Sequence, residues 1–263
     1  MNVFTSDLDR TLIYSKRTIG AQDNIRCIEQ LEGEDLSYMT TRSIELLKEI
    51  QNHTHFVPVT TRSQLQYERI SVFQNEITPK FAIVANGGIV LKEGKRDQQW
   101  DELVAQRLAT ESVSFEEFKT RFKNIRNSDF FLRELEVEGL FYMLRVNPDK
   151  LNMDELTNYM NELSGEGWAS FLHGTKFYAL PFALTKEAAV AYVLSQIDYD
   201  DHFAAGDSLM DLGMLKEAKV GFTPLHGEIY AHYKEQVPVQ LIAESGATFT
   251  EVILEKICKR LVK

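Results

Sequence analysis

Near its beginning the chain reads VFTSDLDRTL at residues 3–12, an apolar run that breaks into two carboxylates, Asp7 and Asp9. The apolar half is typical of a buried β-strand. Two acids at positions i and i+2 of a strand end can be aimed at one hard cation, which takes oxygen ligands. If the strand belongs to a parallel α/β sheet, its carboxyl end is where ligands bind. A loop with two solvated acids is the alternative, so the rest of the chain must supply partners for a site.

The composition is that of a soluble globular protein, with 263 residues, 44% hydrophobic and 26% charged. The formal net charge of −10 argues against nucleic acid and against an anionic membrane as partners. It permits a small anionic substrate, because a metal ion and a few basic side chains can invert the charge locally. The two cysteines, Cys27 and Cys258, have no metal-site or disulfide spacing. Since no signal peptide or membrane-length apolar run is visible, we expect a cytoplasmic protein. The sequence predicts no oligomeric state.

Strand and helix patterns alternate over much of the chain, which predicts βαβ units and a parallel sheet, an α/β fold class. Expected strands beyond the first lie at residues 55–59, 81–85, 202–205, 219–222 and 239–242. Expected helices lie at residues 41–51, around Leu65 and Ile70, and at 185–196, 209–217 and 250–262.

The alternation of strands and helices is interrupted between residues 89 and 177. There we expect helices at residues 100–110, 115–126 and 149–163, a strand at 139–146, and a hairpin at 168–180. This α+β character indicates an inserted second domain at 89–177, within a core made of residues 1–88 and 178–263.

Residues 25–31 and 36–40 form a predicted hairpin directly after the acidic pair. Its position allows a flap over a site, and a plain surface hairpin is equally compatible with the sequence.

Three later features fall at what should be the same sheet edge. Thr60 and Thr61 follow the second strand and could offer hydroxyl and amide groups to an anion, although they could also cap a helix. Lys186 lies in the first turn of its helix, where the macrodipole disfavours a cation. It is therefore either a functional group or a tolerated surface lysine. Asp207 and Asp211, in GDSLMD at residues 206–211, lie four residues apart, and Asp207 could also be an N-cap.

In this order the motifs DxDxT, Thr, Lys and GDxxxD resemble those of the haloacid dehalogenase-like hydrolase superfamily, in its Cof-type and sucrose-phosphatase-like branch. The resemblance extends to Asn86-Gly87-Gly88, to TKEAA at residues 185–189 and to ESGA at residues 244–247. It implies a Rossmann-like, doubly wound core with an inserted α+β cap domain.

The resemblance also implies a Mg²⁺-dependent phosphatase that acts on a small phosphorylated metabolite, most simply a sugar phosphate. Asp7 would be the nucleophile, and Asp9 the acid and base, with its backbone carbonyl on the metal. Thr60 and Thr61 would bind the phosphoryl oxygens. Lys186 would neutralise Asp7 and the transferred group. The remaining metal ligands would be Asp207 and Asp211, the latter directly or through water.

The chain departs from the family pattern at three positions. Arg10 and Thr61 replace common glycines, and Met210 replaces a usual asparagine. These departures keep open a non-catalytic binding protein on the same scaffold. A phosphosugar mutase, which returns the phosphate to a sugar, is the alternative enzyme class. A receiver-type signalling domain would be much shorter.

Leaving-group recognition is expected from the cap. The candidate side chains there are basic: Arg121, Arg133, Arg145, His173 and Lys176.

Overall fold

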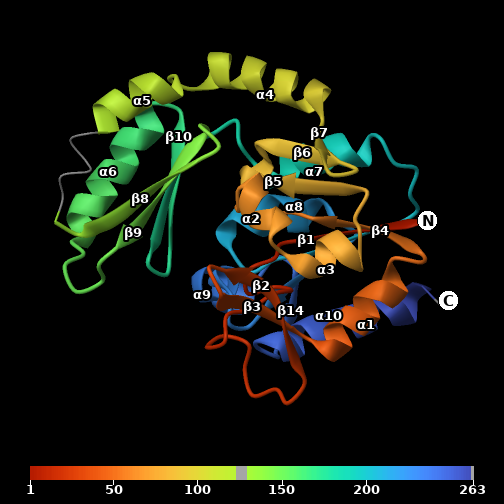
Figure 1. Ribbon diagram of the computed structural model, residues 1–263. Helices are drawn as coiled ribbons and strands as arrows, with labels where there is room; N and C mark the ends of the chain where they lie inside the picture. Colours follow the sequence, from red (N-terminus) through yellow and green to blue (C-terminus); the bar gives the residue numbers. More distant parts are fainter. Residues whose placement is uncertain (123–128, 262–263) are drawn as a thin grey trace. The chain divides into compact units, whose positions relative to one another are not determined.

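The computed structural model describes residues 1–122 and 129–261, which form two compact units (Figure 1). Unit 1 comprises Met1–Asp97 and Lys186–Lys263, and unit 2 comprises Gln98–Thr185. Both boundaries lie some residues beyond the expected ones at 88/89 and 177/178. The reason is strand pairing, since Ile89–Lys92 pairs within unit 1 whereas Lys176–Pro181 pairs within unit 2.

Unit 1 is built on a five-stranded sheet whose neighbouring strands are all parallel, which confirms the predicted α/β class. Its strands run in the order β14 (Gln240–Ile242), β13 (Val220–Pro224), β12 (His202–Ala205), β1 (Asn2–Ser6) and β4 (Thr54–Pro58). The chain passes from β1 to β4 on one side and later returns to β12 on the other. The carboxyl end of β1 therefore lies at a topological switch point, the usual ligand site of open α/β sheets.

The strand expected at 81–85 is present, but its pairing differs from that of the predicted parallel sheet. It is β5 (Phe81–Val84), whose ladder is antiparallel to β6 (Ile89–Lys92), and β7 (Lys95–Arg96) follows on β6. A single parallel bridge from Val59 to Ile83 connects β5 to the residue after β4. The strand thus lies beside the parallel sheet, but its main partner is the next strand in the chain.

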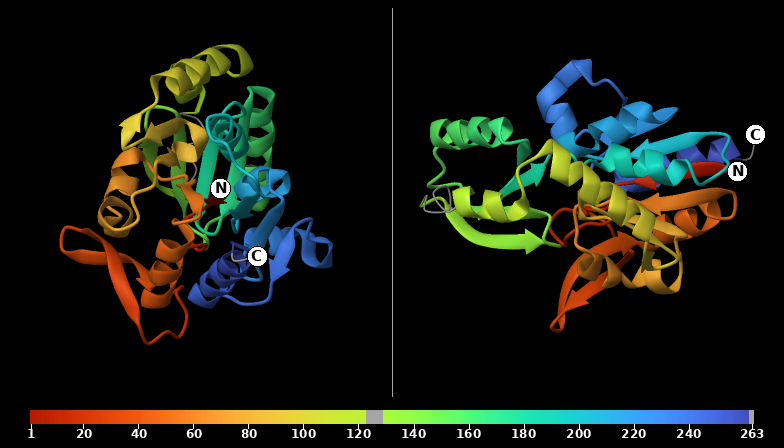
Figure 2. Two further views of the ribbon diagram at one scale, coloured as in Figure 1. Left: turned by 90° about the vertical axis from the view of Figure 1, so that its right-hand side faces the viewer. Right: turned by 90° about the horizontal axis from the view of Figure 1, so that it is seen from above.

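Helices cover both faces of the parallel sheet in unit 1 (Figure 1). On one side α1 (Thr41–Ile50) packs against α10 (Ala247–Leu261), seen in orange and blue in Figure 2. On the other side α7 (Lys186–Leu194) contacts α8 (Leu212–Glu217). Thr40 caps α1, because its side chain accepts a hydrogen bond from Ser43 N.

The single helix expected around Leu65 and Ile70 is instead two short ones, α2 (Gln64–Glu68) and α3 (Ser71–Asn75). Ile70 has an extended backbone and precedes α3, while Leu65 is 67% exposed. The shorter segments α9 (Glu228–Tyr233) and the 3-10 turns η1, η3 and η4 complete unit 1; the turns are Ala85–Gly87, Leu209–Asp211 and Lys234–Gln236.

The predicted hairpin is present as antiparallel β2 (Ile25–Leu31) and β3 (Glu34–Thr40). Its register shifts on both sides of Glu29. This irregularity buries two consecutive residues, Ile28 and Glu29, which a regular strand would place on opposite faces.

Unit 2 is an antiparallel sheet with helices, as expected for the insertion. Its strands run in the order β10 (Trp168–His173), β11 (Lys176–Pro181), β9 (Phe141–Val146) and β8 (Phe131–Val137). Its helices are α4 (Gln98–Glu111), α5 (Phe115–Phe122) and α6 (Met153–Gly165). Trp168 stacks on Phe118 of α5 at 3.7 Å between ring centroids. This contact packs the helix against the sheet.

The helix expected at 149–163 starts later, at Met153, because the side chain of Asn152 caps it. The last residues of the helix expected at 115–126 lie outside the described residues, as does the side chain of Arg121. The sequence did not predict β8, an edge strand rich in exposed charges.

Within the described part of the chain, no helix has the length and apolar character needed to cross a bilayer. Cys27 and Cys258 are both free thiols.

Candidate active site

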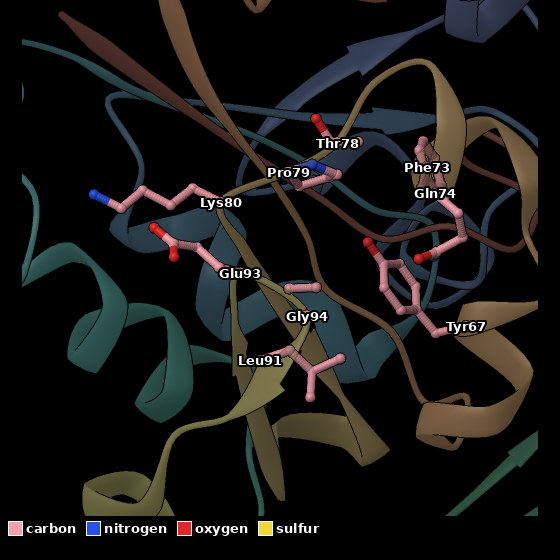
Figure 3. A pocket seen from close by; sticks show the side chains of 10 residues that line it. Tyr67, Phe73, Gln74, Thr78, Pro79, Lys80, Leu91, Glu93 and Gly94 are labelled. Atoms are coloured by element: carbon pink, nitrogen blue, oxygen red, sulfur yellow. The ribbon is translucent and has the colours of Figure 1, made fainter.

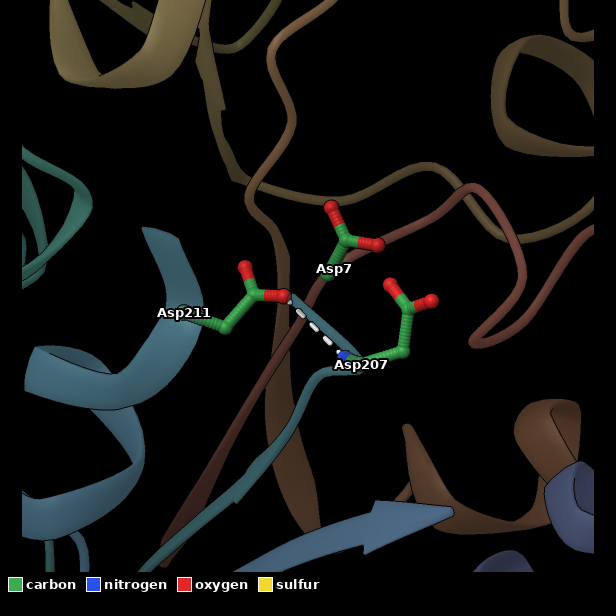
Figure 4. A group of neighbouring side chains, drawn as sticks. All are labelled: Asp7, Asp207 and Asp211. Carbon is green, nitrogen blue, oxygen red and sulfur yellow. Dashed lines mark hydrogen bonds between the residues drawn. The ribbon is translucent and has the colours of Figure 1, made fainter. Parts of the chain in front are cut away.

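Three buried carboxylates converge at the carboxyl end of the parallel sheet (Figure 4). Asp7 directly follows β1, Asp207 comes two residues after β12, and Asp211 ends the turn η3. Each offers a carboxylate oxygen, and these oxygens lie within 4.8 Å of one another. We refer to Asp7, Asp207 and Asp211 as the acidic cluster. Its donors are oxygen atoms only, the ligands that Mg²⁺ prefers.

Lys186 joins the cluster from the first turn of α7. Its Nζ donates to Asp7 Oδ1 and to Asp211 Oδ1, each at 2.6 Å. The lysine is 1% exposed, which excludes the tolerated surface residue that the sequence left open. Two ion pairs therefore hold a cation at a helix end where the macrodipole disfavours it.

The charges of the cluster do not balance. Burial raises the pKa of Asp7 to about 8 against the lowering effect of Lys186, and the nearby Asp211 and Asp207 add to the rise. Burial alone would lower the pKa of Lys186, but the carboxylates of Asp211 and Asp7 raise it above its ordinary value. Three carboxylates around one ammonium leave a net charge near −2 when all are ionised. A divalent cation fits both that charge and the donor set.

Asp211 orients the turn that carries Asp207. Its Oδ2 accepts from Asp207 N at 3.1 Å, from Ser208 N at 2.9 Å and from Ser208 Oγ at 3.0 Å. Ser208, not Asp207, is thus the cap of this turn. Gly206 makes the approach possible, because a Cβ there would lie 2.4 Å from Asp211 Cβ. The polar contacts of Ser208 orient the turn, although Met210 replaces the usual asparagine.

The loop after β4 approaches the same sheet edge. Thr60 is fully buried, and its Oγ1 accepts from Arg62 N at 3.2 Å; Thr61 is half-buried. The next loop holds it in place, since Asn86 N donates to Thr60 O at 2.9 Å and Ala85 N to Arg62 O at 2.7 Å. These bonds explain why residues 85–88 belong with the threonine motif.

Asp9 is separate from the acidic cluster. Its carboxylate forms a forked ion pair with Arg62, with Nε to Oδ2 at 2.7 Å and Nη2 to Oδ1 at 2.9 Å. The opposite edge of Arg62 donates to Glu29 Oε2 at 2.8 Å. Sequence reasoning gave no role to Arg62 or Glu29. The position of Arg62 directly after Thr60 and Thr61 is a signal that could have identified it. Glu29 has no such signal, because its sequence context is that of an ordinary strand residue.

Arg10, the first departure from the family pattern, has a φ of +64°. His226 holds its main chain, with Nε2 donating to Arg10 O at 2.9 Å and Nδ1 accepting from Gly246 N at 3.3 Å. The Arg10 side chain donates to His226 O at 2.8 Å and lies 3.6 Å from Asp207 Oδ2. A second cation therefore lies beside the acidic cluster.

In unit 2, basic residues form a row across the sheet. Arg133 is directly opposite Arg145, Arg145 opposite Lys176, and Lys176 opposite His173. Residues directly opposite share one face of a sheet, so these four side chains, which we call the basic row, project from the same face. Like charges directly opposite destabilise a sheet, so this arrangement has a local cost in stability.

A cavity of about 570 Å³ lies elsewhere in unit 1, between α2, α3 and the β6–β7 turn (Figure 3). Tyr67, Phe73, Lys80 and Glu93 are among its lining residues. None of the acidic cluster lines it, so the cavity and the cluster are separate features.

Comparisons with known proteins agree with this architecture. Residues 1–224 match the family described as sucrose-6F-phosphate phosphohydrolase. No curated protein sequence matches the chain.

Several solved structures share the fold. The sucrose-phosphatase of Synechocystis sp. PCC6803, solved with sucrose and phosphate, is 16% identical with a TM-score of 0.65, and the match covers 98% of this chain and 97% of that one. A haloacid dehalogenase-like hydrolase from Bacteroides thetaiotaomicron is 16% identical with a TM-score of 0.57, covering 97% and 99%. A trehalose-6-phosphate phosphatase related protein is 14% identical with a TM-score of 0.60, covering 99% of each chain.

The family match spans the acidic cluster, Lys186 and the whole of unit 2. The chain belongs to the sucrose-6F-phosphate phosphohydrolase family, and it is a phosphatase of the haloacid dehalogenase-like superfamily.

Proposed function

We propose that the chain is a Mg²⁺-dependent phosphatase that hydrolyses a small phosphorylated metabolite through an aspartyl-phosphate on Asp7. The observation that carries the proposal is the position of Lys186, whose ammonium is hydrogen-bonded to both Asp7 and Asp211 within a group of buried carboxylates. Hydrolysis of a phosphate monoester brings a carboxylate to an anionic phosphoryl group, so cationic charge is needed at that place.

The acidic cluster is the metal site in this proposal. Asp7 and Asp207 would hold Mg²⁺ with their carboxylates and Asp9 with its main-chain carbonyl, while Asp211 would support the site directly or through water. When bound, Mg²⁺ supplies positive charge at the phosphoryl oxygens and stabilises the transition state. The net charge and the oxygen-only donor set support this assignment.

The chemistry divides between two aspartates. A carboxylate oxygen of Asp7 attacks phosphorus, the bond from phosphorus to the leaving oxygen breaks, and Asp9 gives that oxygen a proton. Asp9 then removes a proton from water, which attacks phosphorus, releases inorganic phosphate and regenerates the Asp7 carboxylate. Lys186 offsets charge on Asp7 throughout.

Thr60 and Thr61 would bind the phosphoryl oxygens. Both follow β4 at the sheet edge where Asp7 follows β1. The two hydrogen bonds from residues 85 and 86 fix this loop, which supports a preorganised phosphate site.

The substrate is a sugar phosphate in this proposal. Support comes from the matched family, whose description names a phosphorylated sugar, and from the basic row. The basic row of unit 2 would recognise the part of the substrate beyond the transferred phosphate.

The test is an assay of 4-nitrophenyl phosphate with Mg²⁺ and with a chelator, using the wild type and Asp7→Asn. We expect hydrolysis only by the wild type with Mg²⁺. Activity that survives both chelation and the substitution contradicts the proposal. If a sugar bisphosphate phosphorylates the protein, and transfer of that phosphoryl group to a sugar is then faster than its hydrolysis, the chain is a mutase instead.

A further inference from the structure

The β2–β3 hairpin carries a buried carboxylate, Glu29, whose side chain is 1% exposed. Its Oε2 accepts from Ser37 Oγ at 2.6 Å and from Arg62 Nη1 at 2.8 Å, and its Oε1 accepts from Arg69 Nη2 at 3.2 Å. A buried carboxylate is tolerated only with such charged and hydrogen-bonded partners. The hairpin is therefore tied to the loop that follows β4.

Arg62 connects this carboxylate to Asp9. The guanidinium side chain is 13% exposed and uses separate edges for the two acids, a forked pair to Asp9 and a single bond to Glu29. Ser37 adds a third contact, as its Oγ accepts from Arg62 Nη2 at 3.3 Å. Because a guanidinium is planar and its donors have fixed directions, bonds on one edge determine where the other edge points.

The two acids differ in their access to solvent. The side chain of Glu29 is 1% exposed, whereas that of Asp9 is 46% exposed. Glu29 thus keeps the buried cation paired from the protein side, and Asp9 is the partner that faces solvent. Asp9 can form and break its contact without leaving Arg62 buried and uncompensated.

The register shift around Glu29 gives the hairpin this function. A regular strand would turn Glu29 away if Ile28 faced the core, but the shift on both sides of Glu29 buries both residues. The irregularity interrupts the regular strand pairing locally, and it places the Glu29 carboxylate against Arg62.

We propose that Glu29 is a positioning residue for Asp9: it fixes Arg62 from the hairpin, and Arg62 in turn orients the Asp9 carboxylate toward the leaving oxygen. The hairpin is then a working part of the active site. This inference rests on the proposed function, because it gives Asp9 the proton transfer described above.

A misplaced Asp9 affects substrates unequally. The 4-nitrophenolate ion leaves readily without a proton, whereas phenolate is a much more basic leaving group and needs one. Phenyl phosphate and 4-nitrophenyl phosphate are similar in size, so their ratio of kcat/KM reports proton donation rather than binding or general damage.

The experiment measures that ratio in Glu29→Gln. We expect kcat/KM to fall on the order of tenfold or more for phenyl phosphate and by less than about threefold for 4-nitrophenyl phosphate, since a positioned acid contributes typically 10²–10⁴-fold. In an Asp9→Asn background the same substitution should leave the ratio unchanged, because its effect passes through Asp9. Arg26→Gln is the matched control: it breaks the ion pair of the same hairpin with Glu76 and should keep the wild-type ratio.

Equal losses for both substrates in a folded Glu29→Gln overturn the inference, as does an effect that persists in the Asp9→Asn background. Should Glu29→Gln not fold, Ser37→Ala replaces it, because it removes one contact to each of Glu29 and Arg62. A folded Ser37→Ala with the wild-type ratio overturns the inference too. A wild type without Mg²⁺-dependent activity would instead overturn the proposed function itself.

Discussion

Lys186 Nζ lies 2.6 Å from Asp211 Oδ1, and neither side chain is reached by solvent. The pair connects the first turn of α7 to the turn η3 after β12. Since the same ammonium also bonds Asp7, one cation holds the carboxylates together. We therefore expect the stability of the site to depend on this lysine, to which the proposed function also gives a chemical role.

Replacing Lys186 by Met should separate these two roles. The variant keeps most of the side-chain volume but leaves the buried carboxylates without their ammonium. We expect its activity to be lost and its free energy of unfolding to fall by about 3–5 kcal/mol in chelator. Mg²⁺ should restore part of that loss, because it binds the folded cluster. Urea unfolding with and without Mg²⁺ measures both effects.

Lys219→Met is the control for Lys186→Met. Lys219 pairs with Asp201 at 2.5 Å, but its side chain is 62% exposed. An exposed pair contributes less than about 1 kcal/mol, so this variant should retain the wild-type unfolding curve. Equal behaviour of the two lysine variants would contradict the structural role of Lys186.

Arg10→Gly should strengthen Mg²⁺ binding. The substitution removes a cation 3.6 Å from Asp207 Oδ2 and suits the backbone, whose φ is +64°. We expect the dissociation constant for Mg²⁺ to fall about three- to tenfold at low ionic strength, and less at high salt. Isothermal titration calorimetry in the absence of substrate tests this. Arg10→Lys keeps the charge and should keep the wild-type affinity; an unchanged affinity in Arg10→Gly would show that the charge has no influence on the cluster.

The basic row predicts a change in KM rather than in kcat. Combined replacement of Arg145 and Lys176 by Gln removes two adjacent charges of unit 2. We expect KM for a sugar phosphate to rise about tenfold, equivalent to roughly 1.4 kcal/mol, with 4-nitrophenyl phosphate nearly unaffected. Arg107→Gln, in α4 of the same unit, is the control, since Arg107 pairs with Glu111 within its own helix. Parallel changes for both substrates would argue against recognition by the row.

His202 should make the fold sensitive to acid. The imidazole bonds Thr5 Oγ1 at 2.8 Å, and burial lowers its pKa from 6.5 to about 4. Above pH 6.5 the folded and unfolded states are both neutral at this group, and stability is fully present. As the pH falls from 6.5 toward 4, the unfolded chain takes up a proton that the folded chain does not, so stability is lost.

At pH 5 this effect should amount to about 2 kcal/mol. The free energy of unfolding, measured with urea, should therefore fall between pH 7 and pH 5 by about 2 kcal/mol more in the wild type than in His202→Gln. The same loss in both proteins would mean that other groups cause the acid sensitivity.

The sequence predicted the parts of the fold in which local and tertiary preferences agree. The apolar run of β1 and the alternation of strands and helices correctly indicated a parallel sheet, and the helix expected at residues 41–51 is α1. The expected helix around Leu65 was wrong because the chain turns at Ile70, which no glycine or proline marks. β8 escaped prediction because an edge strand with solvent on its charged face lacks a clear apolar alternation.

The site was predictable where its groups occur in recognisable spacing. The carboxylates and Lys186 follow the motifs, and the structure brings Asp7, Asp207, Asp211 and Lys186 together. Glu29 could not be found this way, because only the irregular register of the hairpin turns it toward Arg62. Ser208 was missed for a related reason, since its contacts to Asp211 depend on a tight turn of the backbone.

The most direct test of the account is to identify the residue that becomes phosphorylated. The Asp9→Asn variant should accept phosphate from 4-nitrophenyl phosphate with Mg²⁺ and release it slowly, because the water lacks its base. Acid quenching, borohydride reduction and mass spectrometry of the peptide that contains residue 7 should then show homoserine at that position, and none without substrate. Turnover by the wild type with no such product, or with the modification at another residue, would contradict the account.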